Sequence, residues 1–269
     1  MTILFDPNFQ LLREDQSIRV FNILLCISQG CGVLAVLLVA IWMGSYENGF
    51  AWSEDPSREF NYHPTFMVMG MVFLYGESLL VYRVFRNERK KFTKTLHVVL
   101  HTMVLVFMVL ALKAVFDNHN LNRDEEGKPS PIVNMYSVHS WVGMTVVVLF
   151  WANYIVGFIS FYFPGLPVPM RQLIMPFHQL AGLLIFMFAS VAVGMGIAER
   201  AAWKNSCWTQ HGEMCGKQLV SNFVGVFSFL YTICVLLLVA NPRWRRQPLP
   251  EEEQLHHLTS SMSHHSMQD

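Results

Sequence analysis

Six long runs of apolar residues alternate with short polar segments along the chain, and each run contains few charged side chains. They lie at residues 20–43, 64–85, 95–116, 135–163, 173–198 and 218–240. Crossing about 30 Å of hydrocarbon takes roughly 20 helical residues, so each run is long enough to span a membrane. The pattern predicts an all-α membrane protein with six transmembrane helices.

The two ends of the chain are polar. Residues 1–19 carry acidic and basic side chains, and the apolar run that follows is too long for a signal-peptide core, so we expect a retained helix. The end of the chain is rich in Glu, Ser and His, a composition typical of disorder. We therefore expect an N-terminal segment at 1–19, a six-helix membrane domain at 20–240 and a disordered tail at 241–269.

Basic residues are distributed unevenly between the two sides of the predicted membrane domain. If both termini are cytoplasmic, that side carries about twice as many Lys and Arg residues as the other, the bias that cytoplasmic loops show. We therefore expect both termini in the cytoplasm. The chain has no net charge and only 14% charged residues, which argues against nucleic acid as a partner.

A histidine stands near the start of four successive apolar runs: His63, His97, His139 and His178. Consecutive membrane helices run in opposite directions, so His63 and His139 fall on one side and His97 and His178 on the other. Two imidazoles at each face are the ligand set for two six-coordinate haems, held by a four-helix core of the second to fifth helices. Because such irons have no open coordination position, the pattern favours transmembrane electron transfer.

Glycines follow three of these histidines at helical spacing. Gly143 and Gly182 come four residues after their histidines, and Gly70 comes seven residues after its own. Each glycine therefore lies on the face of its histidine, where a missing side chain would give a flat macrocycle access to the backbone. Small residues also mediate contacts between membrane helices, which is the alternative interpretation.

His101 leaves the choice of one ligand open. It lies one helical turn after His97 on the same face, so either side chain satisfies the pattern. We expect His97 to be the ligand, because it is nearer the basic loop and matches His178 in depth. His101 is then a hydrogen-bonding neighbour.

Two of the five cysteines share the loop between the fifth and sixth helices. The predicted topology places Cys207 and Cys215 on the non-cytoplasmic side, where the environment favours a disulfide. A Cys207–Cys215 bond is one expectation, and two free thiols are the other.

The sequence around the histidines resembles the cytochrome b561 family. The likeness runs through about residues 20–240, and the segment Tyr-Ser-x-His-Ser-Trp is its most specific motif. The segments that carry it are Asn61-Tyr62-His63-Pro64, Lys94-Thr95-Leu96-His97, Phe116-Asp117-Asn118-His119-Asn120, residues 134–141 and Met175-Pro176-Phe177-His178.

This resemblance implies six transmembrane helices, two haem b groups, ascorbate as the cytoplasmic electron donor and a homodimer. His63 and His139 would ligate the non-cytoplasmic haem, and His97 and His178 the cytoplasmic one. The motif residues Tyr136, Ser137 and Trp141 are expected in the haem environment.

Basic residues gather at the cytoplasmic mouth of the expected inner haem site. Lys94 lies three residues before His97, and Arg171 lies seven residues before His178. Lys90 stands nearby in the sequence. These residues would attract the ascorbate monoanion, and comparable residues line an ascorbate pocket in family members. Arg83 is the candidate partner of a haem propionate. The alternatives are a topological or lipid-binding role for the loop and ordinary snorkelling for Arg83.

A second group of polar residues closes the third helix on the opposite side. His119 can exchange a proton near neutral pH, and the resemblance implies contact with ascorbate or its radical. Asn118 stands beside it, and Lys113 would attract an anionic acceptor. The acceptor would be monodehydroascorbate or a ferric chelate, and the resemblance then implies a transmembrane ascorbate-dependent oxidoreductase. A helix cap is the alternative for His119.

Two other functions fit parts of the pattern. A di-haem subunit of a larger redox complex would need the same histidines. A metal or proton transporter could use His97 with His101, but Glu77 is the one acid expected to be buried in the spans. The sequence does not fix the membrane, which is a secretory or endosomal-lysosomal vesicle or the plasma membrane.

Overall fold

The computed structural model describes residues 13–204, 207 and 211–250, and most of them are helical. Six helical segments are long and apolar enough to cross a membrane, which confirms the predicted six-helix fold. They are Glu14–Tyr46, Pro56–Val84, Lys90–Asn120, Val138–Tyr162, Val168–Lys204 and Gly216–Ala240. Most of the predicted disordered tail, from residue 251 on, lies outside the described residues.

Several helices extend past the apolar runs that predicted them. The second begins at Pro56 rather than 64, and the fifth runs from Val168 to Lys204 rather than from 173 to 198. Apolar composition marks only the part inside the hydrocarbon, whereas a helix continues into the polar interface for as long as its backbone hydrogen bonds are satisfied. The polar ends of the helices are therefore where site residues gather.

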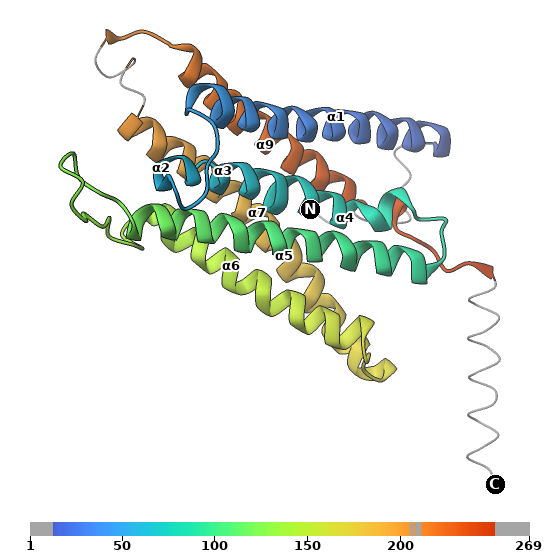
Figure 1. Ribbon diagram of the computed structural model, residues 1–269. Helices are drawn as coiled ribbons and strands as arrows, with labels where there is room; N and C mark the ends of the chain where they lie inside the picture. Colours follow the sequence, from blue (N-terminus) through green and yellow to red (C-terminus); the bar gives the residue numbers. More distant parts are fainter. Residues whose placement is uncertain (1–12, 205–206, 208–210, 251–269) are drawn as a thin grey trace.

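The helices form a bundle of adjacent antiparallel segments (Figure 1). Helix α1 (Glu14–Ile41) packs along α9 (Gly216–Ala240), and α6 (Val138–Gly157) packs along α7 (Val168–Lys204). Between these two pairs lie α3 (Tyr62–Phe66), α4 (Tyr75–Val84) and α5 (Lys90–Asn120). The short helix α2 (Pro56–Glu59) contacts the C-terminal end of α5.

Wide π-helical turns occur in three of the spans, at the end of the first and the fourth and inside the second. They are η2 (Trp42–Tyr46), η3 (Met67–Leu74) and η4 (Phe158–Tyr162). A π turn inserts an extra residue and shifts the face that the following residues present. In the second span, η3 lies between α3, which carries His63, and α4, which carries Ser78, so it sets how these two residues face α5.

The interior contains aromatic and aliphatic side chains, and the outside is apolar as well. Tyr75, Phe186 and Tyr231 are fully buried at the centre of the bundle. Large side chains such as Leu37 and Val106 are more than half exposed. An apolar exterior on helices of this length is what contact with lipid requires.

Candidate haem sites

The four predicted histidines lie in two pairs. The rings of His63 (α3) and His139 (α6) have their centres 6.2 Å apart. The rings of His97 (α5) and His178 (α7) have their centres 6.5 Å apart. These are the two pairs that alternating helix direction predicts.

An iron atom held between two imidazoles would set the distance between their rings. A metal–nitrogen bond of about 2.0 Å and a ring radius of about 1.1 Å on each side give roughly 6.2 Å between ring centres. The observed separations of 6.2 Å and 6.5 Å match this value closely. Both pairs therefore fit bis-histidine ligation of a haem.

Hydrogen bonds orient all four rings in the same way. Each Nδ1 lies at hydrogen-bonding distance from a carbonyl oxygen, which can only accept, so Nδ1 carries the proton and Nε2 remains for a metal. The pairs are His63 with Ala111 O at 3.2 Å, His139 with Ala192 O at 2.9 Å, His97 with Ser78 O at 2.9 Å, and His178 with Asn153 Oδ1 at 3.0 Å.

His101 is held differently. Its Nε2 lies 2.8 Å from Ser78 Oγ, and that hydroxyl donates its only hydrogen to Tyr75 O at 2.6 Å. Nε2 of His101 must therefore carry the proton and donate to Ser78. The centre of the His101 ring lies 4.5 Å from the centre of the His97 ring. However, Nε2, the atom that the four other histidines leave free for a metal, is hydrogen-bonded to Ser78 in His101.

Two glycines lie against the histidine rings. A Cβ atom built on Gly157 would lie 2.6 Å from His178 Cε1, and one on Gly196 would lie 2.9 Å from His139 Cε1. Of the glycines expected to leave room for a macrocycle, Gly143 lines the open space around His63 and His139, and Gly182 lies near Asn153. The glycines that leave room for the rings of His178 and His139 are thus on the neighbouring helix, not on the same one.

A repeated spacing explains this arrangement. Gly157 follows His139 by 18 residues, and Gly196 follows His178 by 18 residues. Eighteen residues make five helical turns, so each glycine lies on the face of its histidine about 27 Å along the axis. Because α6 and α7 are antiparallel, the histidine of each helix meets the glycine of the other. This signal was available in the sequence and was missed.

A cavity of about 470 Å³ surrounds His63 and His139 and opens among polar side chains. Three residues expected near the outer site line it: Asn118, His119 and Tyr136. The ring of His119 also hydrogen-bonds Asn134 Oδ1 at 2.9 Å. The space beside this histidine pair is therefore continuous with side chains that can bind a solute and donate a proton to it.

The family model described as eukaryotic cytochrome b561 matches residues 62–204, a range that contains all four paired histidines and more than half of the chain. The chain belongs to the cytochrome b561 family. Haem b is the cofactor of this family, and the two histidine pairs fit it.

Curated relatives agree with this assignment. A Caenorhabditis elegans protein, named as a homologue of the transmembrane ascorbate-dependent reductase CYB561, is 69% identical over 269 residues, 100% of both chains. The Mus musculus transmembrane ascorbate-dependent reductase CYB561 is 36% identical over 228 residues, 85% of this chain and 86% of the relative. The Rattus norvegicus plasma membrane ascorbate-dependent reductase CYBRD1 is 32% identical over 221 residues, 81% of this chain and 74% of the relative.

Other residues expected near the outer haem of this cytochrome b561 are not among those that line the cavity, and Trp141 lines a separate groove between α6 and α7. Lys113 Nζ lies 2.6 Å from carboxylate oxygens of both Glu59 and Asp117, so two anions already surround it. Ser137 caps α6 through the Ser140 N–H and donates to Glu199, and the exposed Trp141 donates to Met135 O.

The acid that is buried differs from the one expected. Among the described residues Glu59 is fully buried, whereas Glu77, the acid expected to be buried in the spans, is half-buried. Glu59 lies in the short helix α2, ahead of the apolar run, where hydropathy gives no indication of burial. Glu77 itself accepts hydrogen bonds from Gln29 of α1 and Tyr231 of α9, on the side of α4 away from the histidines.

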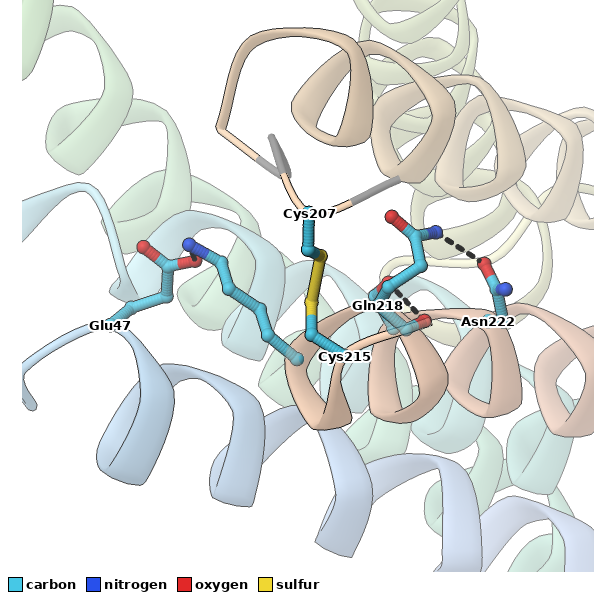
Figure 2. Close-up of a disulfide and its surroundings, with 7 residues drawn as sticks. Glu47, Cys207, Cys215, Gln218 and Asn222 are labelled. Atoms are coloured by element: carbon cyan, nitrogen blue, oxygen red, sulfur yellow. Dashed lines mark hydrogen bonds and ion pairs between the residues drawn. A yellow bond between two sulfur atoms is a disulfide. The ribbon is translucent and has the colours of Figure 1, made fainter. Parts of the chain in front are cut away.

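A disulfide and a group of charged residues close the end of the bundle that carries His63 and His139 (Figure 2). Cys207 is bonded to Cys215, with an S–S distance of 2.08 Å. Close by, Glu47 is paired with Lys217 and Arg200, each at 2.7 Å. The guanidinium of Arg200 lies 4.7 Å from the centre of the Phe60 ring. These contacts tie the ends of α1, α7 and α9 together around the cavity. The disulfide is one of the two states expected from the sequence, whereas sequence spacing gave no sign of the Glu47 pairs.

The Glu47 pairs are expected to make stability depend on pH. Burial alone would raise the pKa of Glu47, but the hydrogen bonds and charges of Lys217 and Arg200 outweigh it and hold the pKa below the ordinary 4.5. The stabilisation is therefore complete above pH 4.5 and is lost as pH falls through the lower folded-state value. We expect thermal unfolding followed by circular dichroism to show a stability difference between wild type and Glu47→Gln that shrinks below pH 4.5. A constant difference across this range would contradict the assignment.

The inner site has its own polar surroundings. Lys94 Nζ donates to Phe161 O at 2.8 Å, and the Phe161 ring lies 5.3 Å from that of His178. The charges of Lys90 and Arg171 both act on Lys94, so the three expected donor-site residues lie near one another. Arg83 is buried and donates to Val239 O at the end of α9.

Proposed function

We propose that this cytochrome b561 transfers electrons across the membrane from cytoplasmic ascorbate, through two haem b groups, to an acceptor on the other side. The proposal rests on one observation: four histidines form two facing pairs, with 6.2 Å and 6.5 Å between the ring centres. In each ring Nδ1 is hydrogen-bonded, which leaves Nε2 for a metal. The relatives that match most of the chain are named ascorbate-dependent reductases, which supports ascorbate as the donor.

The protein's part in this reaction is to hold the haems and control access to them. His63 and His139 would ligate the outer haem, and His97 and His178 the inner one. Haem iron supplies reversible one-electron chemistry, while the surrounding residues set its position, depth and electrostatics. The buried aromatic side chains of Tyr75 and Phe186 exclude water from the centre of the bundle.

The cytoplasmic donor site is proposed at Lys94, Arg171 and Lys90. Three cations close together at the mouth of the inner site raise the local concentration of an anionic donor. Arg83 is proposed as a propionate partner, because its Nε has no hydrogen-bond partner among the described residues although the group is buried.

The acceptor site is proposed at the outer cavity. His119 and Asn118 line it together with the outer histidine pair, and a proton carried by His119 would balance the charge of an arriving electron. Monodehydroascorbate and a ferric chelate are both anions of suitable size. Lys113 would act here by holding the Glu59 and Asp117 carboxylates, since its single positive charge is shared between them.

The proposed orientation puts both termini in the cytoplasm. Trp244 Nε1 donates to Ser17 Oγ, so the two ends of the described chain lie at the same end of the bundle. The basic loop near the inner histidine pair is at this end too, since Arg246 donates to Glu88 O. We propose a homodimer in a secretory or endosomal-lysosomal vesicle or in the plasma membrane.

An absorption spectrum of the purified protein tests this function. We expect a Soret band, sharp α and β bands on adding ascorbate, and two haems per chain by pyridine haemochrome analysis. Proteoliposomes with ascorbate inside or outside and ferric citrate on the opposite side would then report transfer across the bilayer. A protein that remains colourless after haem supplementation would overturn the proposal.

A further inference from the structure

The four paired histidines differ in what holds their Nδ1 atoms. Three of them donate to a backbone carbonyl, of Ala111, Ala192 or Ser78. His178 alone donates to a side chain, Asn153 Oδ1, at 3.0 Å. A substitution can therefore remove this one hydrogen bond without changing the backbone.

Asn153 stands in surroundings that do not otherwise suit an amide. It lies in the last half of the α6 span, four residues before Gly157, and lines an apolar groove of about 590 Å³ between α6 and α7. Polar side chains inside a membrane span are costly, so their presence calls for a specific partner. His178 lines the same groove and is that partner.

Two residues of α6 together fix the His178 ring. Gly157 follows Asn153 by four residues and so lies on the same helix face. The ring fills the space beside Gly157, while Asn153 receives its Nδ1 proton. Gly182 of α7 lies beside the amide, since a Cβ built there would lie 3.6 Å from Asn153 Nδ2. Gly157 provides the space for the His178 ring, and Asn153 fixes the orientation and the tautomer of that ring.

We propose that Asn153 is a positioning residue that sets the orientation, the tautomer and the electron-donating strength of His178, and thereby the reduction potential of the inner haem alone. This inference rests on the proposed function. A hydrogen bond from Nδ1 makes an imidazole a stronger donor to iron and stabilises the ferric state. Removing the acceptor therefore favours the ferrous state and weakens retention of the haem.

The test compares Asn153→Leu and Asn153→Gln with wild type in the full chain loaded with haem. Spectroelectrochemical titration resolves two midpoint potentials. We expect Asn153→Leu to raise the inner potential by about 59 mV, which is a tenfold change in the ferric-to-ferrous ratio for one electron. The outer potential stays unchanged, and Asn153→Gln, which keeps an amide oxygen, stays near wild type. Haem retention in Asn153→Leu falls by about 10- to 100-fold at the inner site.

Asn222→Leu is the matched control, because Asn222 is an asparagine of the α9 span that bonds Gln218 and no histidine. If Asn153→Leu fails to assemble, Asn153→Ser, whose side chain is too short to reach His178, gives the same comparison. Two haems with both potentials unchanged in these variants would overturn the inference and leave the proposed function intact. Wild-type protein without haem would instead overturn the proposed function.

Discussion

Replacing Gly157 by valine is expected to remove the inner haem and leave the outer one in place. The first added carbon would lie 2.6 Å from His178 Cε1, closer than non-bonded carbon atoms approach. The ring would have to leave its present position, and an iron–nitrogen bond of about 2.0 Å does not tolerate such a shift. Pyridine haemochrome analysis should give one haem per chain instead of two, with rapid reduction by ascorbate abolished.

The reciprocal variant and a neutral one complete this experiment. Gly196→Val should remove the outer haem instead, since its Cβ would lie 2.9 Å from His139 Cε1. The inner haem would then still be reduced by ascorbate, but transfer to an external acceptor would stop. Gly30→Val on α1 faces open space and should retain both haems. Two haems in Gly157→Val would contradict the assigned geometry.

Exchanging His97 and His101 for leucine, one at a time, is expected to give opposite results. His97→Leu should lose the inner haem, halving the haem content and abolishing transmembrane transfer. His101→Leu should keep two haems, because Nε2 of His101 is engaged with Ser78 and cannot bind iron at the same time. Haem content and low-temperature electron paramagnetic resonance spectra distinguish the two variants. The reverse pattern would make His101 the ligand.

The sequence predicted the number of spans and the pairing of the histidines for clear physical reasons. Apolar runs of membrane length allow few alternatives to transmembrane helices, and opposite directions of consecutive helices determine which histidines share a face. The choice between His97 and His101 remained open because it depends on hydrogen bonds to Ser78, whose carbonyl and hydroxyl hold one ring each.

Other features of the sites were beyond the reach of sequence patterns. Three of the four Nδ1 acceptors are backbone carbonyls, which every residue possesses, so no residue type marks them. The Glu47 pairs join the ends of three helices far apart in the chain. The π turn η3 changes the register inside an apolar run, where composition carries no trace of it.

The equal spacing from histidine to glycine in α6 and α7 has a consequence for the evolution of the protein. Deleting one residue between His139 and Gly157 would turn the glycine by about 100° and shift it by 1.5 Å, disturbing both histidine pairs at once. Electron transfer slows steeply as the distance between cofactors grows, so a change in the length of either segment would impair the proposed transfer. A chain suited to a thinner or thicker bilayer would consequently differ at the helix ends, such as the last turns of α7 after Gly196, where length can change while the spacing between the two histidine pairs is preserved.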